Sequence, residues 1–227
     1  MKRHSITIAA IITFALLFSC GLSFAQNSPI SKGSMMASGE LSLFTTSKYC
    51  TMPNGEWDTL GKDVTMMVIQ LYPSLSYFIT NGLALGGTIE LGRMSWSGDS
   101  YSYSYSHSNR IFGVGPRIGY YFNLKSDTSR IKGSVYPFLN SELLYSMNKT
   151  HAEYSYYSGT NHVYDDTASG LSARLGGGLI VMISNAAGLR FNASYQKDIM
   201  KLKYYKEKEK SVTGNRFNFG LGFSVFF

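Results

Sequence analysis

TGNRFNFGLGFSVFF, residues 213–227, ends the chain and decides its fold. Residues two apart in this stretch share a chemical character. One series is apolar throughout: Phe217, Phe219, Leu221, Phe223, Val225 and Phe227. The other is mostly polar or small: Arg216, Asn218, Gly220, Gly222, Ser224 and Phe226. Because successive side chains of a strand point to opposite faces, this period of two predicts a β-strand.

The polar face of this strand is glycine-rich and carries Arg216, which is a poor fit to a core shared by two sheets. An apolar face turned outward and a polar face turned inward fit a barrel in lipid. Phe227 falls in register with the outward face, and this ending resembles the carboxy-terminal signature that the barrel assembly machinery of the bacterial outer membrane reads. We therefore expect an all-β transmembrane barrel, with Phe227 as its assembly signal.

Composition agrees with a single barrel domain. The chain has 227 residues, 15% aromatic residues, 23 glycines and 17 tyrosines, and its mean hydropathy is −0.07. These values exclude a helical membrane protein and a disordered chain. The formal charge of +7 is spread through turns, loops and inward positions without a basic helix or a binding motif, so nucleic acid is not an expected partner.

The amino terminus has the pattern of a cleaved secretory signal at residues 1–25. Basic residues precede an apolar run at 6–18, and Ser23-Phe24-Ala25 offers a small-residue cleavage site. Cleavage leaves residues 26–33 as a short periplasmic segment before a barrel domain at 34–227, and loss of Lys2 and Arg3 lowers the formal charge to +5.

A lipoprotein signal is the alternative, because Leu17-Phe18-Ser19-Cys20 resembles a lipobox whose cysteine is acylated. Phe18 is bulky for its place in that motif. If Cys20 leaves with the signal, Cys50 is alone and no intramolecular disulfide is expected.

Seven more stretches alternate in the same way, and with the last one they predict eight antiparallel strands. Their ranges are 34–47, 65–79, 83–97, 110–122, 135–148, 169–183 and 188–200. The links after the second and sixth are short, and Thr80-Asn81-Gly82 indicates a tight hairpin. The links at 48–62, 98–109, 149–168 and 201–212 are longer. Short periplasmic turns and long outer loops are typical of outer-membrane barrels, with both termini in the periplasm.

Inward positions carry charges of alternating sign on the third to sixth strands. They are Glu90, Arg117, Glu142 and Arg174. A buried ion is costly unless paired, so we expect one lumenal network, which Glu40 joins across the interior, with Arg190 and Arg216 nearer the two ends. Inward glycines should make room for large side chains: Gly86, Gly115, Gly119, Gly176, Gly178, Gly220 and Gly222. A plug of paired side chains suits an eight-stranded interior; an ion-selective constriction is the alternative.

Aromatic residues near strand ends suggest belts at the lipid–water boundary. The lower belt would contain Tyr77, Tyr120, Tyr121, Phe122, Tyr136, Phe226 and Phe227, and the upper belt Trp96, Tyr145 and Tyr195. Ordinary sheet aromatics are the alternative explanation for any one of them.

The chain resembles the small outer-membrane β-barrel family of Gram-negative bacteria, which includes the barrel domain of outer membrane protein A. The resemblance covers residues 34–227 and is carried by the alternation, Leu83-Ala84-Leu85-Gly86-Gly87, Gly113-Val114-Gly115-Pro116-Arg117-Ile118-Gly119-Tyr120 and the terminal phenylalanine. It implies a single eight-stranded barrel. Members of the family are structural proteins, adhesins, narrow channels or, in a few branches, enzymes that modify lipid A, and the motifs do not choose among the first three.

An enzyme is not expected. Barrel deacylases of lipid A use a histidine, a serine and an orienting carboxylate near the outer rim. The nearest match is Ser106-His107-Ser108-Asn109, which departs from the usual His-x-Ser spacing. His151 and His162, with acidic neighbours, look like solvated surface. No catalytic, cofactor or metal-binding residue is assigned.

The loops are the candidates for binding. Tyrosines alternate with serines or crowd together in two of them: Tyr101, Tyr103, Tyr105, Tyr154, Tyr156 and Tyr157. Tyrosine and serine make contact surfaces at low entropic cost, although the alternation also fits a β-extension above the membrane. Lysines in residues 201–210 suit anionic lipopolysaccharide, although a solvated charged loop is the default interpretation. The expected partners are outer-membrane lipid and lipopolysaccharide, the assembly machinery and an extracellular ligand.

Overall fold

The computed structural model describes residues 28–49, 65–99, 103–123, 132–156, 158–159, 161–203 and 210–227. The predicted signal at 1–25, including Cys20, lies outside the described residues, as does Cys50. No helix in the described part of the chain is long and apolar enough to cross a membrane.

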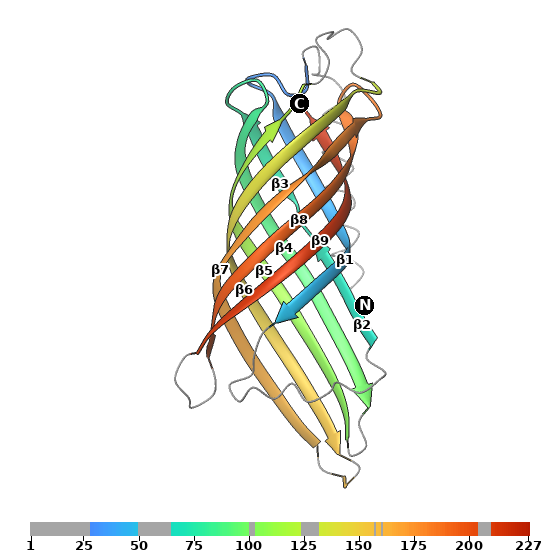
Figure 1. The fold of residues 1–227 in the computed structure, drawn as a ribbon, viewed down its shortest axis with the longest axis vertical. Coiled ribbons are helices and arrows are strands. Elements are labelled where there is room, and N and C mark those ends of the chain that lie inside the picture. Colours follow the sequence, from blue (N-terminus) through green and yellow to red (C-terminus); the bar gives the residue numbers. More distant parts are fainter. Residues whose placement is uncertain are drawn as a thin grey trace, which may run out of the picture.

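The strands form one antiparallel sheet that closes on itself (Figure 1). They are β1 (Met35–Tyr49), β2 (Thr65–Leu71), β3 (Ser74–Phe78), β4 (Leu83–Asp99), β5 (Tyr103–Tyr121), β6 (Val135–Tyr156), β7 (Asn161–Met182), β8 (Ala187–Lys203) and β9 (Lys210–Phe226). Each strand from β3 onward pairs with the next, and β9 pairs with β1 to close the ring. Strand pairing therefore runs around the whole ring.

β2 and β3 are two halves of one barrel strand, since both pair with β1 and with β4. Pro73 causes the break because it has no N–H to donate to the ladder. Hydrogen bonds on either side keep the wall continuous: the Tyr72 N–H donates to the Glu40 carbonyl at 2.8 Å, and the Ile89 N–H donates to the Pro73 carbonyl at 2.9 Å. The structure thus confirms a closed, eight-stranded antiparallel barrel.

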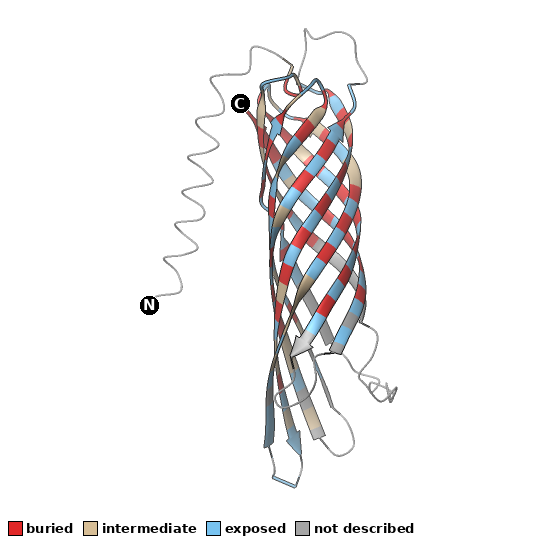
Figure 2. Cartoon of the chain, turned by 90° about the vertical axis from the view of Figure 1, so that its left-hand side faces the viewer, coloured by how far each residue is buried: buried red, intermediate tan, exposed pale blue. Residues whose placement is uncertain are grey.

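Buried and exposed residues alternate along the strands, as Figure 2 shows. On β9 the predicted outward residues Phe217 and Phe219 are 54% and 57% exposed, whereas Arg216 is completely buried. Val225, the exception in this series, is buried and has Ala37 and Ala187 as its ladder partners. An apolar outer surface around a polar interior is the arrangement of a transmembrane barrel.

The two ends of the barrel differ. At one end, tight turns join β3 to β4 and β7 to β8; Gly82 takes a φ of +83° in the first, a value that glycine tolerates. This end also holds the last residue, whose N–H and carbonyl are hydrogen-bonded to Met35 at 3.0 and 2.7 Å. At the other end β4, β5, β6 and β7 extend beyond the remaining strands (Figure 1).

Those extensions correct two predicted loops. Much of 98–109 and 149–168 continues the antiparallel ladder, with Gly98 opposite Tyr105 and Lys149 opposite Thr167. The sequence patterns there lack an apolar face because both faces of the extension lie beyond the apolar band. Backbone hydrogen bonds continue the ladder there without an apolar face.

An apolar floor fills the lumen at the turn end. It consists of Ile30, Met36, Phe78, Ala84, Tyr121, Tyr136, Phe138, Ile180, Met182 and Phe226. Tyr121, Tyr136 and Phe226 are therefore not members of a lipid-facing belt, since they are 5% exposed or less and pack inside. Ile30 belongs to the segment before β1, and its carbonyl accepts a hydrogen bond from Gly82 at 2.8 Å.

Candidate functional site: a charged network in the lumen

Eight buried charged side chains occupy the lumen beyond the apolar floor, within the described residues. They are Glu40, Glu90, Glu142 and Asp198, with Arg117, Arg174, Arg190 and Arg216. None is more than 4% exposed. Four carboxylates thus face four guanidinium groups, and their formal charges cancel.

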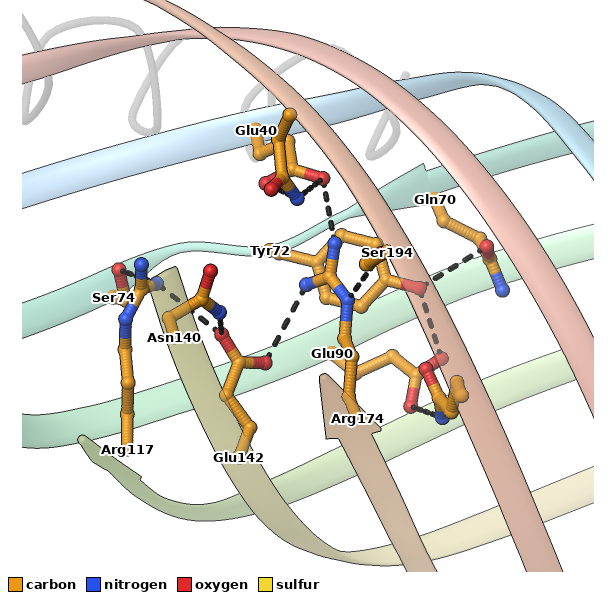
Figure 3. A network of polar contacts seen from close by, with 12 residues as sticks. Glu40, Gln70, Tyr72, Ser74, Glu90, Arg117, Asn140, Glu142, Arg174 and Ser194 are labelled. Atoms are coloured by element: carbon orange, nitrogen blue, oxygen red, sulfur yellow. Dashed lines mark hydrogen bonds and ion pairs between the residues drawn. The ribbon is translucent and has the colours of Figure 1, made fainter. Parts of the chain in front are cut away.

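Arg174 on β7 is the centre of this network (Figure 3). One terminal nitrogen lies 2.6 Å from Glu40 across the interior, and the other lies 3.4 Å from Glu142 on the neighbouring strand. Its Nε donates to the Ser194 hydroxyl at 2.9 Å, and its guanidinium stacks 3.8 Å from the centre of the Tyr72 ring. All three nitrogens of this buried cation, and one face of its guanidinium group, have a partner.

Arg117 extends the network along β5. It lies 3.3 Å from Glu142 and donates to the Ser74 hydroxyl at 2.9 Å. The Asn140 amide also donates to Glu142, at 2.9 Å. Register explains the grouping, because Glu142 on β6 lies directly opposite both Arg117 on β5 and Arg174 on β7.

Arg190 connects the network to the floor. Its Nε lies 3.8 Å from Glu40, which is too long for a hydrogen bond, and its guanidinium stacks 3.7 Å from the centre of the Phe138 ring. Glu40 is held in place by the Asn192 amide, which donates to both carboxylate oxygens at 2.9 and 2.8 Å. Gly220 leaves the space for Glu40, because a Cβ there would collide with the carboxylate.

Glu90 belongs to a second group and pairs with Arg216 rather than with Arg117. The Arg216 guanidinium donates to Glu90 at 2.8 Å and to both oxygens of Asp198 at 2.9 and 3.1 Å. The β4–β5 register sets Glu90 opposite Gly113 and Arg117 opposite Gly86, so the two predicted partners are offset along the barrel. The positions of the charges along each strand do not reveal this stagger between neighbouring strands.

Tyr72 joins the two groups. Its hydroxyl donates to Gln70 at 3.1 Å and lies 3.4 Å from a Glu90 oxygen, while its ring lies against Arg174. The five predicted lumenal residues, Glu40, Glu90, Arg117, Glu142 and Arg174, are therefore all in one connected set. Asp198 is a member that sequence reasoning missed, although it shares the inward parity of Asn192 on β8.

Several predicted glycines make room as expected. A Cβ at Gly119 would lie 3.0 Å from the Tyr121 ring, and one at Gly176 would lie 3.1 Å from the Asn140 side chain. At Gly86, Gly115, Gly178 and Gly222 a Cβ would instead collide with a backbone carbonyl of the next strand. These glycines allow close approach of the strands themselves.

His107 and His151 lie on the extension, and His151 is directly opposite Ser108 on its outer face. His107 points inward, whereas Ser106 and Ser108 point outward, since neighbours on a strand face opposite ways. His151 faces outward between two carboxylates: Nδ1 lies 2.7 Å from Asp165 and Nε2 lies 2.9 Å from Glu153. These hydrogen bonds raise the pKa of His151 above its usual 6.5. Both ring nitrogens of His151 thus have carboxylate partners within the described part of the chain.

The predicted contact tyrosines lie on the extension rather than in loops. Tyr103 pairs with Tyr156 and Tyr105 with Tyr154 across β5 and β6, whereas Tyr101 and Tyr157 lie outside the described residues. Two edge-to-face ring pairs stand there: His107 with Tyr154 at 5.3 Å and Tyr156 with His162 at 5.7 Å. The tyrosine–serine alternation thus belongs to a β-extension of the strands, and ligand contact by these tyrosines stays a prediction.

No protein-family model matches the chain, and no curated protein matches it. Solved structures do. Neisserial surface protein A has 13% identity and a TM-score of 0.44, covering 86% of this chain and 97% of that one. Ail, the attachment invasion locus protein of Yersinia pestis, has 15% identity and a TM-score of 0.40, with coverage of 86% and 99%. OprG, an outer membrane protein of Pseudomonas aeruginosa, has 9% identity and a TM-score of 0.44, with coverage of 87% and 97%. At such low identities and scores, the barrel assignment depends on the strand pairing above, and no role follows from these similarities.

Proposed function

We propose that this chain is an integral outer-membrane barrel that does not conduct and that acts as a structural or surface-interaction protein. The observation that carries the proposal is the filled lumen: an apolar floor at one end and, beyond it, a network of four carboxylates and four arginines that is buried and balanced in charge. An eight-stranded barrel is narrow enough for side chains to fill it. A conducting pore would need exposed charges along a continuous path.

The differing ends support one orientation. Short turns and both termini of the barrel domain belong to the periplasmic side in barrels of this kind, which puts the β4–β7 extension outside the cell. Phe227, paired with Met35 at the turn end, is then available to the assembly machinery in the periplasm before the seam closes. The predicted outer loops, including lysine-rich 201–210, would face lipopolysaccharide.

The extension supports an adhesin-like role. It continues beyond the apolar band as a paired ladder with Tyr156 and Val163 exposed at 39% and 58%. Exposed rings on a preformed sheet bind with little loss of conformational freedom. An extracellular ligand is the partner that this surface fits, and the doubly hydrogen-bonded His151 speaks against a hydrolase there.

Planar-bilayer recording tests the closed lumen. The purified barrel should insert and show no steady conductance, because side chains fill the interior. A steady, ion-selective current that changes in Arg117→Leu would establish the narrow channel instead. Arg93→Leu is the matched control, since Arg93 lies on the outer surface.

Labelling on intact cells tests the orientation. Single cysteines replace Ser158 at the tip of the extension or Asn185 in the β7–β8 turn, in a background without Cys20 and Cys50. A membrane-impermeant maleimide should label Ser158→Cys and spare Asn185→Cys. The reverse pattern would overturn the orientation.

A further inference from the structure

A row of cations marks the far edge of the apolar band on the outer surface. On four strands the first outward side chain beyond the last apolar one is basic: Arg93 after Leu91 on β4, Arg110 after Phe112 on β5, Lys149 after Met147 on β6, and Lys201 after Ile199 on β8. All four cations are exposed. The apolar residues below them include Leu91, Phe112 and Ile199, which are 43%, 49% and 51% exposed.

Three of these cations are direct neighbours across the sheet. Arg93 lies opposite Arg110, and Arg110 lies opposite Lys149. Like charges in directly opposite positions destabilise a sheet. The barrel therefore places side by side three charges that repel one another.

The three adjacent cations of this row, Arg93, Arg110 and Lys149, are not neutralised by the described residues. None of Arg93, Arg110 and Lys149 has an ion pair or a side-chain hydrogen bond to the described part of the chain. The carboxylates next above the row, Asp165 and Glu153, are hydrogen-bonded to His151. The described residues therefore supply no anion to Arg93, Arg110 and Lys149.

The position of the row indicates where such an anion comes from. Directly below it the outward residues Leu91, Phe112 and Met147 are apolar, and directly above it the outward residues Ser95, Ser108 and His151 are polar. This change marks the boundary between the hydrocarbon and the headgroups of a membrane. A lipid bound there would place its acyl chains against Leu91 and Phe112 and its headgroup against the cations.

We propose that Arg93, Arg110 and Lys149 form a binding site for the phosphates of a phosphorylated glycolipid in the outer leaflet. Two adjacent guanidinium groups offer planar, bidentate donors to phosphate oxygens, and the lysine adds a third charge. A soluble polyanion would use the charges but not the apolar side chains directly beneath them. The cellular setting rests on the proposed orientation, whereas the chemistry of the site does not.

Binding of lipid A to the full barrel in a zwitterionic detergent tests the site. Native mass spectrometry follows titration with lipid A that carries two phosphates and with the same lipid A after removal of its phosphates. The wild-type barrel should prefer the phosphorylated form. Because a basic residue near an anionic surface contributes about fivefold in affinity, Arg93→Gln with Arg110→Gln should weaken binding by about 25-fold.

A matched double variant controls for net charge. Lys32→Gln with Lys132→Gln removes two exposed cations at the turn end and should leave the affinity unchanged. In urea titration without lipid, Arg93→Gln with Arg110→Gln should be at least as stable as wild type, because it relieves repulsion. This measurement shows that the variant is folded.

Three results would overturn the proposal: equal affinity for dephosphorylated lipid A, an equal loss in the two double variants, or full competition by soluble dextran sulfate with no preference for the lipid. An inverted labelling pattern at Ser158 would instead refute the orientation, and the detergent titration would still report on the site. The lipid-binding site and the orientation can therefore be refuted independently.

Discussion

Replacing Arg216 with methionine is the sharpest test of the lumenal network. Arg216 donates three hydrogen bonds, one to Glu90 at 2.8 Å and two to Asp198 at 2.9 and 3.1 Å. The three side chains are at most 1% exposed. Methionine keeps much of the volume but removes the charge, so two carboxylates lose their common cation and the described lumen acquires one net negative charge.

The structure sets the size of the effect. Breaking a buried ion pair by removing one partner costs about 3–5 kcal/mol, because a buried charge is left uncompensated. Glu90 retains only longer contacts, with Gln196 at 3.3 Å, Tyr72 at 3.4 Å and Ser146 at 3.5 Å. Asp198 retains Gln196 at 3.1 Å. We expect the upper half of that range, about 4–5 kcal/mol in the free energy of unfolding.

Urea titration in a zwitterionic detergent measures the loss, with far-UV circular dichroism and the heat-dependent gel shift as independent probes. Arg110→Met is the control, since Arg110 is exposed on the outer surface, and it should change stability by no more than about 0.5 kcal/mol. The triple variant Glu90→Gln, Asp198→Asn and Arg216→Met removes all three charges together. It should be more stable than Arg216→Met alone, because no bare carboxylate remains.

Two outcomes would refute this reasoning. A loss of less than about 1 kcal/mol in Arg216→Met would mean that the carboxylates are solvated or neutral without it. A triple variant less stable than the single one would mean that shape, rather than charge compensation, dominates the lumen.

Three further predictions concern other parts of the barrel. The raised pKa of His151 means that its hydrogen bonds stabilise the extension fully below pH 6.5 and lose that effect as the pH rises through the folded-state pKa. NMR protection factors for the amides of β6 and β7 should therefore fall as the pH rises through this pKa. They should not fall in His151→Gln. Gly222→Ala should hinder closure of the β1–β9 seam, seen as less heat-modifiable protein on gels, whereas Gly87→Ala, whose Cβ has its nearest neighbour at 3.7 Å, should close normally. Phe138→Ala should lower the free energy of unfolding by about 3–5 kcal/mol in urea titration, and Phe138→Leu by less, because leucine fills the floor but offers Arg190 no ring.

Alternation and connection length predicted the wall of the barrel well at the turn end. The stretch 83–97 became β4, Leu83–Asp99, and Thr80-Asn81-Gly82 forms the expected turn, with the Leu83 N–H donating to the Thr80 carbonyl at 3.3 Å. At the far end, 149–168 carried no apolar period, and the ladder there was not recognisable. A strand with both faces in water leaves no hydrophobic trace in its sequence.

Side-chain direction was predictable inside the lumen, but pairing was not. Parity alone puts Glu90, Arg117 and Arg216 inside the barrel. Which carboxylate meets which arginine depends on the stagger between strands, and this follows from the closed geometry. The same limit applies to Tyr121 and Phe226, whose inward parity was readable but whose aromatic character suggested lipid.

The barrel contains two kinds of arginine, and electrostatics separates their roles. Inside, Arg216 is matched by carboxylates, so its removal should destabilise the fold in any detergent. Outside, Arg110 stands between two other cations with no matching carboxylate in the described chain. Removing Arg110 should leave the fold intact and should weaken only the binding of a phosphorylated lipid. The arginines paired in the lumen hold the fold, whereas the outer cations without a carboxylate among the described residues are the ones that we propose to bind a lipid phosphate.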